Sequence, residues 1–465
     1  MASPISFGTD GWRAQIADDY TFDNLREVSN ALAVYLLKYQ PEKSKNGVAI
    51  GYDTRFRSAD FARVVADTLA GAGFPVFLSE RDAPTPAIAW STRSMGLATG
   101  IMITASHNPP IWNGFKFFNP LGGPADKDAS NAVEFVLGKK PSAKSAPASV
   151  QTFDPRPALV EQLHKVVDFD RLKSVKGVAV YDAVYGTGRG YVDDLLRECG
   201  WDVHSIHDVP DPMFGGMLPD PANPKCHQTL CDEVKSRGAN IGLANDPDAD
   251  RFGIVDSTGE YLTPNQILPI LYHHLLETRG MRGPVARTLP TTGMLDAIAK
   301  TYGQEVIETP VGFKWVGAAI EEQGAILGGE ESGGLSIGGH YGGKDGVLAD
   351  LLLAEVWATH QKPLGELLRG LEAKYGEFHS TRTDLHLEDE PKRALMDKMK
   401  STPPLEVAGQ KVVKVVSTDG VKLTLADGSW ILLRASGTES LIRIYSEASS
   451  PEKLDALSKA AVALA

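Results

Sequence analysis

Short apolar runs and amphipathic segments follow one another in the same order three times along the chain. In the first copy, an apolar run at residues 48–52 precedes an amphipathic segment at residues 58–70, and Gly73 separates that segment from a second apolar run. Short apolar runs predict buried strands, amphipathic spacing predicts a helix, and glycine is typical of a helix end. The order of strand, helix, glycine and strand therefore predicts a parallel α/β unit.

The same order recurs twice, at residues 177–206 and at residues 285–307. Each copy continues to a later apolar strand, at residues 100–103, 240–244 and 325–327, and each of these strands ends in an unusual polar loop. Because α/β proteins bind ligands at the carboxyl ends of parallel strands, we expect the three loops to carry the chemistry. Three chemically distinct loops at matching places predict three domains that face one cleft.

The last part of the chain predicts a different architecture. Apolar segments at residues 412–417 and 422–425 are joined through Asp419 and Gly420, and a further turn leads to residues 430–433. Turns of this kind between short apolar runs are typical of antiparallel hairpins. We therefore expect an α+β piece at this end.

Together the patterns predict four domains. We expect the α/β class, with three related α/β domains of mixed, mainly parallel sheets that face one cleft and a C-terminal α+β domain. The predicted domains span residues 1–150, 151–258, 259–370 and 371–465. The segment at residues 141–155, rich in Pro, Ser, Ala and Lys, is the predicted linker between the first two.

The bulk composition narrows the class of partner. The chain has 465 residues and a net charge of −12, which argues against nucleic acid or membrane as a partner but permits a small anionic substrate. No apolar run is long enough to span a membrane, and the first residues lack the pattern of a signal peptide. The three cysteines, an odd number in a long chain, favour a reducing compartment. We therefore expect a cytoplasmic protein.

Three aspartates alternate with small residues after the predicted strand at residues 240–244. In an extended loop this spacing places Asp246, Asp248 and Asp250 on one side, with about 6.5 Å between neighbours. Carboxylates that share a site repel one another unless a hard cation lies among them. An EF-hand is excluded because its sixth position requires glycine and is Arg251 here. The cluster predicts a Mg²⁺ site with room for a phosphate oxygen, and an exposed Asp-Pro turn is the alternative.

A serine lies just after another predicted strand end. Ser106 precedes His107 in a turn bounded by Asn108 and Pro109. A phosphorylated serine carries about two negative charges and becomes a ligand for a metal held by aspartates. A plain turn residue and a Ser-His-Asp hydrolase are the alternatives. The hydrolase is disfavoured because the Gly-x-Ser-x-Gly elbow is absent and adjacent Ser and His rarely reach triad geometry.

Two further loops carry groups suited to a sugar phosphate. Glu330 and Ser332 lie in a glycine-bordered loop, where a carboxylate beside a hydroxyl suits vicinal sugar hydroxyls. Arg434 stands before a Ser-Gly-Thr sequence, so its guanidinium can fork onto a phosphate while the following amides form an anion nest. Taken alone, each loop is equally consistent with a solvated surface loop.

One glycine-rich segment imitates a nucleotide-binding loop. Residues 338–344 fit the spacing Gly-x-x-x-x-Gly-Lys and precede an apolar helix. Asp345 follows, at the position where a P-loop needs Ser or Thr for its Mg²⁺. We therefore expect Lys344 to bind phosphate as a point charge, and a nucleotide-dependent kinase is the alternative that rests on this segment.

Taken together, the loops resemble the α-D-phosphohexomutase family over essentially the whole chain. The motifs that carry the resemblance occur in the family's order: Phe7-Gly8-Thr9-Asp10-Gly11-Trp12-Arg13, Thr104-Ala105-Ser106-His107-Asn108-Pro109, Asp246-Pro247-Asp248-Ala249-Asp250-Arg251, Gly329-Glu330-Glu331-Ser332-Gly333 and Arg434-Ala435-Ser436-Gly437-Thr438. The resemblance implies three related α/β domains and a fourth α+β domain around a central cleft, in agreement with the repeat.

The resemblance also implies the reaction. Phospho-Ser106 would give its phosphoryl group to a hexose phosphate, and the bisphosphate would turn around and return its other phosphate, so that hexose 1-phosphate and hexose 6-phosphate interconvert. Mg²⁺ and glucose 1,6-bisphosphate are the implied cofactor and activating intermediate. The implied metal ligands are Ser106, Asp246, Asp248 and Asp250.

Further roles follow from matching positions. Arg13, His107 and Lys116 would lie near the transferred group, with Lys116 as the preferred general base because neighbouring cations would lower its pKa. The implied substrate contacts are Glu330, Ser332, Arg251, Lys314, Lys344, Arg434, Ser436, Gly437 and Thr438.

The choice of sugar rests on finer detail. The Glu-Glu-Ser-Gly-Gly form of the loop at Glu331 looks more like glucose-phosphate mutases, most like bacterial phosphoglucomutases, than the forms of dual mannose/glucose or glucosamine enzymes. Two departures are Asp220, where glutamate is usual, and Ala435, where many members have proline. A phosphomannomutase or a glucose 1,6-bisphosphate synthase is the near alternative, and a non-catalytic sugar-phosphate-binding protein is the alternative of another class. We expect a monomer or a homodimer.

Overall fold

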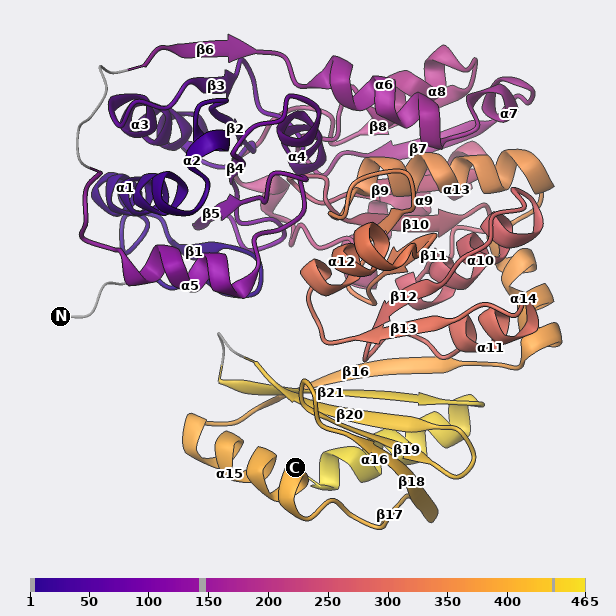
Figure 1. Ribbon diagram of the computed structural model, residues 1–465. Helices are drawn as coiled ribbons and strands as arrows, with labels where there is room; N and C mark the ends of the chain where they lie inside the picture. Colours follow the sequence, from indigo (N-terminus) through magenta and orange to yellow (C-terminus); the bar gives the residue numbers. More distant parts are fainter. Residues whose placement is uncertain (1–4, 142–147, 437–439, 465) are drawn as a thin grey trace.

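The structure is a computed structural model that describes residues 5–141, 148–436 and 440–464 (Figure 1). These residues form four sheets, one in each of four successive parts of the chain. In Figure 1 the first three parts lie in the upper half and at the right, and the fourth lies beneath them. Among the residues described, no helix is both long and apolar enough to cross a membrane.

The first sheet has six strands in the order β1-β5-β4-β2-β3-β6. Its strands are β1 (Trp12–Gln15), β2 (Val48–Tyr52), β3 (Val76–Ser79), β4 (Thr99–Ile103), β5 (Trp112–Phe117) and β6 (Val150–Phe153). The helices of this part are α1 (Phe22–Tyr39), α2 (Pro41–Ser44), α3 (Ser58–Gly71), α4 (Thr85–Ser94) and α5 (Lys127–Phe135). Strand β2 pairs parallel with β3 and β4, and β5 runs antiparallel to β4.

The second sheet has the order β11-β10-β9-β7-β8 and repeats this arrangement. Its strands are β7 (Val178–Asp182), β8 (Asp202–Ile206), β9 (Ile241–Asn245), β10 (Phe252–Asp256) and β11 (Tyr261–Leu262). The helices are α6 (Arg156–Val166), α7 (Phe169–Lys173), α8 (Val192–Glu198) and α9 (Gln228–Arg237). Strand β7 pairs parallel with β8 and β9, and β10 runs antiparallel to β9.

The third sheet repeats it again in the order β13-β12-β14-β15. Its strands are β12 (Val285–Thr288), β13 (Val306–Thr309), β14 (Leu327–Gly329) and β15 (Leu335–Ile337), and its helices are α10 (Pro264–Glu277), α11 (Met294–Thr301), α12 (Phe313–Gln323), α13 (Gly346–His360) and α14 (Leu364–Tyr375). Strand β12 pairs parallel with β13 and β14, and β15 runs antiparallel to β14. The predicted repeat of mixed, mainly parallel sheets is therefore confirmed.

The glycines predicted to stop the repeated helices do so by their backbone conformation. Gly73, Gly200 and Gly303 have φ values of 90, 85 and 63°. This left-handed region is open to glycine and costly for most other residues, so each helix ends there and the chain turns into the next strand.

The fourth sheet is antiparallel in every pair, with the order β16-β21-β20-β19-β18-β17. Its strands are β16 (His379–His386), β17 (Glu406–Val407), β18 (Gln410–Val416), β19 (Val421–Leu425), β20 (Trp430–Ala435) and β21 (Leu441–Ala448), and its helices are α15 (Asp389–Ser401) and α16 (Pro451–Leu464). The predicted C-terminal α+β part is confirmed.

Hydrophobic packing is most extensive between the second and third parts, which share one core, whereas the first and the fourth each have a core of their own. Smaller clusters join Tyr341 to the first part and Leu289 to the fourth. Helix α13 is buried on all sides because it belongs to the third part of the chain but packs against β9 and β10 of the second sheet. Its first turn therefore lies where the second sheet presents its loops.

Two predicted domain limits fall inside regular elements. Residue 150 is the first residue of β6, which pairs with β3 of the first sheet, and residue 370 lies within α14. The proline-rich composition predicted a linker over 141–155, but its last residues join the sheet, while residues 142–147 lie outside the described residues. We propose that the first domain extends to Phe153 and the third to Tyr375.

Candidate active site

Ser106 occupies the loop that follows β4. Its side chain is buried, and its Oγ donates a hydrogen bond of 2.5 Å to Asp246 Oδ2 from the second domain. Its backbone N–H donates to Thr104 Oγ1 at 2.9 Å, and its φ of 51° is left-handed. A non-glycine residue in that conformation is uncommon and is found where the surrounding structure imposes it. The loop therefore holds the hydroxyl of Ser106 against the acidic cluster.

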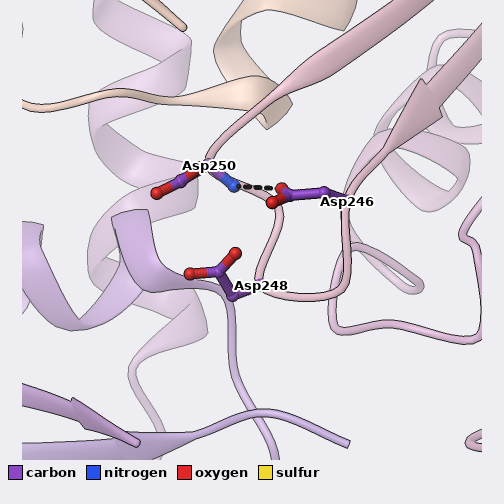
Figure 2. A group of neighbouring side chains, drawn as sticks. All are labelled: Asp246, Asp248 and Asp250. Atoms are coloured by element: carbon purple, nitrogen blue, oxygen red, sulfur yellow. Dashed lines mark hydrogen bonds between the residues drawn. The ribbon is translucent and has the colours of Figure 1, made fainter. Parts of the chain in front are cut away.

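The three aspartates form a buried cluster after β9 (Figure 2). One ligand atom from each of Asp246, Asp248 and Asp250 lies within 4.8 Å of the others. The spacing predicted an extended loop, but the loop forms a turn, which the hydrogen bond of 2.8 Å from Ala249 N–H to Asp246 O closes. Convergence therefore comes from a turn, with the amides of Asp250 and Arg251 donating to Asp246 Oδ1 at 3.0 Å each.

The cluster has the chemistry of a hard-cation site. Asp248 Oδ1 and Asp250 Oδ1 are buried and accept no hydrogen bond. Burial, followed by repulsion from these two carboxylates, raises the pKa of Asp246 well above its ordinary value. Buried carboxylate oxygens without donors suit a divalent cation that prefers oxygen ligands, so the residues present fit Mg²⁺.

Lys116 on β5 contacts three carboxylates. Its Nζ is 2.9 Å from Asp248 Oδ2, 3.0 Å from Asp250 Oδ2 and 3.1 Å from Asp10 Oδ2. Burial lowers the pKa of Lys116, but the charges of Asp10 and of the two cluster aspartates outweigh it and raise that pKa well above its ordinary value. The expected lowering of this pKa is wrong, and a lysine that holds its proton so firmly is a poor general base.

Arg13 contacts the loop that carries Ser106, and His107 is part of that loop. Arg13 Nη1 donates to Asn108 Oδ1 at 2.8 Å, and His107 Nδ1 is 3.4 Å from Ser106 Oγ. Burial, followed by the positive charges of Arg251 and Arg13, lowers the pKa of His107 well below its ordinary value. His107 is therefore neutral near pH 7 in this arrangement.

Lys344 belongs to the acidic cluster and not to a nucleotide loop. Its Nζ lies 3.0 Å from Asp250 Oδ2 and 3.4 Å from Asp10 Oδ2. The next residue, Asp345, caps α13 by accepting a hydrogen bond of 2.8 Å from the N–H of Leu348. Asp345, which stands where a P-loop has Ser or Thr, is therefore the N-cap of α13.

The loop at residues 329–333 after β14, the predicted sugar loop, contacts the loop at residues 246–251, the predicted metal loop, through Arg251. Arg251 Nη1 donates to Ser332 O at 3.1 Å, which joins the second and third domains. Glu330 is buried, and its Oε1 accepts the N–H of Gly312 at 3.0 Å. Burial, followed by the charge of Glu331, raises the pKa of Glu330 to about 7.

Lys314 lies apart from these contacts. Its Nζ is 5.4 Å from the centre of the Trp315 ring, and the charges that act on it come from Asp126, Lys127 and Asp128 at the start of α5. Burial lowers the pKa of Lys314. Among the contacts that the structure gives it, none joins Lys314 to the acidic cluster, so its role stays a prediction.

The fourth domain contributes Arg434 at the end of β20. Its Nε donates to Asp419 Oδ2 at 3.0 Å, and the same oxygen accepts the N–H of Val311 from the third domain at 3.0 Å. The backbone N–H of Ser436 donates to Leu441 O at 3.0 Å. Gly437 and Thr438 lie outside the described residues.

Sequence reasoning missed two side chains that hold this site together. Thr85 Oγ1 donates to Asp248 Oδ2 at 2.6 Å, and its N–H donates to Asp248 O at 2.8 Å. Asp10 Oδ2 accepts from Arg13 at 3.2 Å and pairs with Lys116 and Lys344. Asp10 stood inside the first motif, but Thr85 gave only the signal of a residue before a proline at a helix start.

The comparisons with known families agree with this geometry. In chain order, residues 4–143, 157–259 and 263–375 match alpha/beta/alpha domains I, II and III of phosphoglucomutase/phosphomannomutase, and residues 390–464 match its C-terminal domain. The chain therefore belongs to the phosphoglucomutase/phosphomannomutase family, and the predicted resemblance to the α-D-phosphohexomutases is confirmed.

Individual relatives extend over nearly the whole chain. A phosphoglucomutase/phosphomannomutase of Thermococcus kodakarensis is 32% identical over 450 residues, which cover 96% of this chain and 95% of that protein. A protein of Methanothermobacter thermautotrophicus named "Probable phosphoglucosamine mutase" is 30% identical and covers 97% and 95%. A crystal structure from Thermus thermophilus, provisionally named a phosphomannomutase, has 33% identity and a TM-score of 0.87 and covers 100% and 99%. Because the names differ in the sugar, they establish a phosphohexomutase and leave the hexose open.

Proposed function

We propose that the protein interconverts hexose 1-phosphate and hexose 6-phosphate, with glucose phosphate favoured, through phospho-Ser106 and a hexose 1,6-bisphosphate. The observation that carries this proposal is the hydrogen bond of 2.5 Å between Ser106 Oγ and Asp246 Oδ2. A buried hydroxyl held against an acidic, cation-binding cluster is suited to carry a phosphoryl group, because the cation neutralises the charge that the group brings.

The residues that would hold Mg²⁺ are Asp246, Asp248 and Asp250, with an oxygen on Ser106 as the fourth ligand. When bound, this ion supplies charge neutralisation for the moving phosphoryl group. Support comes from the two orphaned carboxylate oxygens of the cluster.

Positive side chains of the protein lie close to Ser106, where the phosphoryl group would be transferred. Lys116, Lys344 and Arg13 all contact Asp10 Oδ2, so one carboxylate gathers three positive side chains beside the Ser106 loop. Positive groups fixed in a buried site stabilise charge on transferred phosphoryl oxygens without reorganisation. We assign Lys116 to this electrostatic role, in place of the general base predicted from sequence.

The reaction is an exchange of one phosphoryl group and one proton. The bond between phosphorus and Ser106 Oγ breaks, a bond to a sugar hydroxyl oxygen forms, and the proton of that hydroxyl replaces the phosphoryl group on Oγ. The bisphosphate then turns, its other phosphoryl group returns to Ser106, and the proton returns to the sugar oxygen. Every step is reversible because the chemical bonds made and broken are of one kind.

The substrate must be held in two orientations. We assign Glu330 and Ser332 to the sugar hydroxyls and Arg251 to the bridge between the sugar and metal loops. Arg434 and Ser436, with Gly437 and Thr438, would hold the phosphate that does not react. The guanidinium of Arg434 supports this role because it can fork onto phosphate oxygens.

The preference for glucose rests on the Glu-Glu-Ser-Gly-Gly form of the sugar loop. A phosphomannomutase remains the near alternative, since relatives named for several sugars match over the whole chain. A glucose 1,6-bisphosphate synthase releases the intermediate, so a separate phosphoryl donor must rephosphorylate Ser106 after each turnover.

The deciding experiment compares kcat/KM for glucose 1-phosphate, mannose 1-phosphate and glucosamine 1-phosphate, with Mg²⁺ and a catalytic amount of glucose 1,6-bisphosphate. We expect turnover of all three or of a subset, with the glucose substrate fastest. Release of bisphosphate equal to the amount of phosphorylated enzyme, without sustained turnover, would identify a synthase, because the assay contains no other phosphoryl donor. Failure to convert any of the three while mass spectrometry shows phosphorylated Ser106 would overturn the proposal in favour of a binding protein.

A further inference from the structure

A buried arginine lies behind the Ser106 loop. Arg55 follows β2 just before α3, and its side chain has no exposed surface. Its two terminal nitrogens donate four hydrogen bonds to backbone carbonyls of a single loop, at 2.5 Å to Ser106, 2.5 Å to Asn108, 2.8 Å to Pro109 and 3.0 Å to Trp112. One guanidinium thus holds both ends of the segment that carries the serine.

The orientation of Arg55 is itself fixed. Its Nε lies 3.1 Å from Asp53 Oδ2, and both side chains of this pair are fully buried. Asp53 Oδ1 accepts the N–H of Arg55 at 3.0 Å and the hydroxyl of Ser58 at 2.7 Å. The ring of Phe214 from the second domain covers the guanidinium at 4.9 Å. A buried charge with a buried counter-ion and a covering ring has one available position.

The loop that Arg55 contacts contains a residue in an unfavourable backbone conformation. Ser106 has a φ of 51°, a conformation that most L-residues avoid and that persists only where neighbouring groups impose it. Pro109 and Pro110 remove two amide donors from this loop. Of the four carbonyls that Arg55 contacts, that of Pro109 also accepts the N–H of Trp112 at 3.0 Å, and the bonds from Arg55 add to this pairing. A lysine in its place has three donors in another geometry and leaves carbonyls unpaired.

The Arg55 side chain also places a positive charge next to Ser106, the proposed phosphoryl carrier. Its terminal nitrogen bonds the carbonyl oxygen of Ser106 itself. A phosphoserine adds about two negative charges, and a cation fixed behind it in a buried site is screened little by solvent.

We propose that Arg55 is a positioning residue of the phosphoryl carrier. It fixes the loop from Ser106 to Trp112 so that the serine oxygen stays against Asp246, and its charge offsets that of the phosphoryl group. It does not touch the sugar. The inference rests on the proposed function, since it assigns Arg55 to the phosphoryl step of that reaction.

The test uses Arg55→Met and Arg55→Lys in the full-length protein, with Arg63→Met as the matched control. Arg63 lies on α3, half exposed, and pairs with Asp67 at 4.0 Å. We expect Arg55→Met to lower kcat about 100-fold with KM changed less than about threefold, because a carrier displaced by about 1 Å loses reactivity and not sugar binding. Arg55→Lys should retain more activity than Arg55→Met, and the control should match the parent protein.

A second readout does not depend on turnover. After incubation with glucose 1,6-bisphosphate, intact mass gives the fraction of phosphorylated Ser106, and ³¹P NMR gives its resonance. We expect one narrow phosphoserine resonance in the parent protein and a shifted or broadened one in folded Arg55→Lys. An unchanged resonance together with a kcat loss no larger than the unfolded fraction would reduce Arg55 to a fold-stabilising residue and overturn the inference. If Arg55→Met does not fold, Arg55→Lys and Asp53→Asn decide.

The parent protein separates this inference from the proposed function. Failure of the parent to convert any hexose phosphate contradicts the proposed function. A parent that turns over, beside Arg55 variants with normal kcat and an unchanged ³¹P resonance, contradicts only the role of Arg55.

Discussion

The junction between the first and second domains differs in kind from that between the third and fourth. At the first junction, groups at the reaction centre make buried contacts that join the domains. Ser106 Oγ bonds Asp246, Thr85 Oγ1 bonds Asp248, and Lys116 Nζ bonds Asp248 and Asp250, all of them buried. The ion pair of 2.5 Å between Arg189 and Asp82 joins the same domains outside the reaction centre. Domain docking and chemistry therefore share several side chains.

At the second junction the two tasks belong to different residues. Lys422 Nζ donates to Leu289 O at 2.7 Å and to Glu308 Oε1 at 2.8 Å, and Glu447 Oε1 accepts the N–H of Gly293 at 2.9 Å. None of these is a predicted substrate contact. Arg434, which is one, makes no such contact itself with the described residues but pairs with Asp419, which accepts the N–H of Val311 from the third domain. Mutations should therefore separate docking from substrate binding at the second junction and fail to do so at the first.

The largest expected effect is that of Ser106→Ala. Removal of the carrier hydroxyl should lower turnover by at least about 10⁴-fold, since no other group can accept the phosphoryl in its place. The melting temperature should stay within a few degrees of the parent, because one buried hydroxyl contributes about 1 kcal/mol. Coupled-assay rates and thermal unfolding check both, with Ser130→Ala on α5 as the control. Near-normal turnover would remove Ser106 from the mechanism.

Metal removal should come next. Chelation by EDTA should lower turnover by about 10³-fold, because several kcal/mol of charge stabilisation is lost, and added Mg²⁺ should restore it. Asp246→Asn should show the same loss without rescue. Exposed Asp384→Asn, on β16, provides the control. Full activity after exhaustive chelation would contradict a metal at the aspartate cluster.

Arg434→Met tests the substrate side of the second junction. We expect KM to rise about 30-fold with kcat changed less than about threefold, since a lost charge-assisted contact to the distant phosphate weakens binding by about 2 kcal/mol. The unfolding transition should be unchanged. A loss confined to kcat would place Arg434 at the transferred phosphoryl group instead.

Lys422→Met tests the docking side. Lys422 is buried, and its Nζ lies 4.3 Å from the centre of the Trp430 ring. Its removal takes the Lys422 donor from the Leu289 carbonyl, whereas Glu308 keeps its hydrogen bond of 2.8 Å from Arg287. We expect about 3 kcal/mol of lost stability, measured by urea unfolding, with KM of the folded fraction unchanged. A raised KM with intact stability would show that docking and substrate binding are not separate here.

The smallest effect concerns Glu330 and depends on pH. Its pKa is raised to about 7 in the folded protein, above the ordinary value of 4.5, so its stabilising contribution is present below pH 4.5 and is lost as pH rises through 7. Glu330→Gln should therefore be more stable than the parent by up to about 3 kcal/mol at pH 8, and the advantage should shrink toward pH 4.5. Urea unfolding across this range checks the trend. A constant difference at all pH values would contradict a raised pKa.

Local patterns were sufficient for most of the fold. The strand at residues 48–52, the helix that begins at residue 58 and the stop at Gly73 all stand where the apolar spacing places them. They are predictable because each depends on neighbours in sequence: alternation, capping and the backbone freedom of glycine. The end of the first domain could not be predicted from such local patterns, because β6 joins the sheet through pairing with β3, more than 70 positions away.

The candidate site divides along the same line. The sequence by itself determined the chemical inventory: a serine after β4, three aspartates after β9, a carboxylate loop after β14 and an arginine at the end of β20. Motif order sufficed because each loop brings its own reactive groups.

Only the tertiary structure decided how those groups act on one another. It placed Lys116 among three carboxylates and so turned an expected base into a fixed cation. It also brought Arg55 beneath the Ser106 loop and Thr85 against Asp248. A pKa and a hydrogen bond depend on distance and burial, and these residues, which are 51 to 163 positions apart, acquire both only when the chain packs.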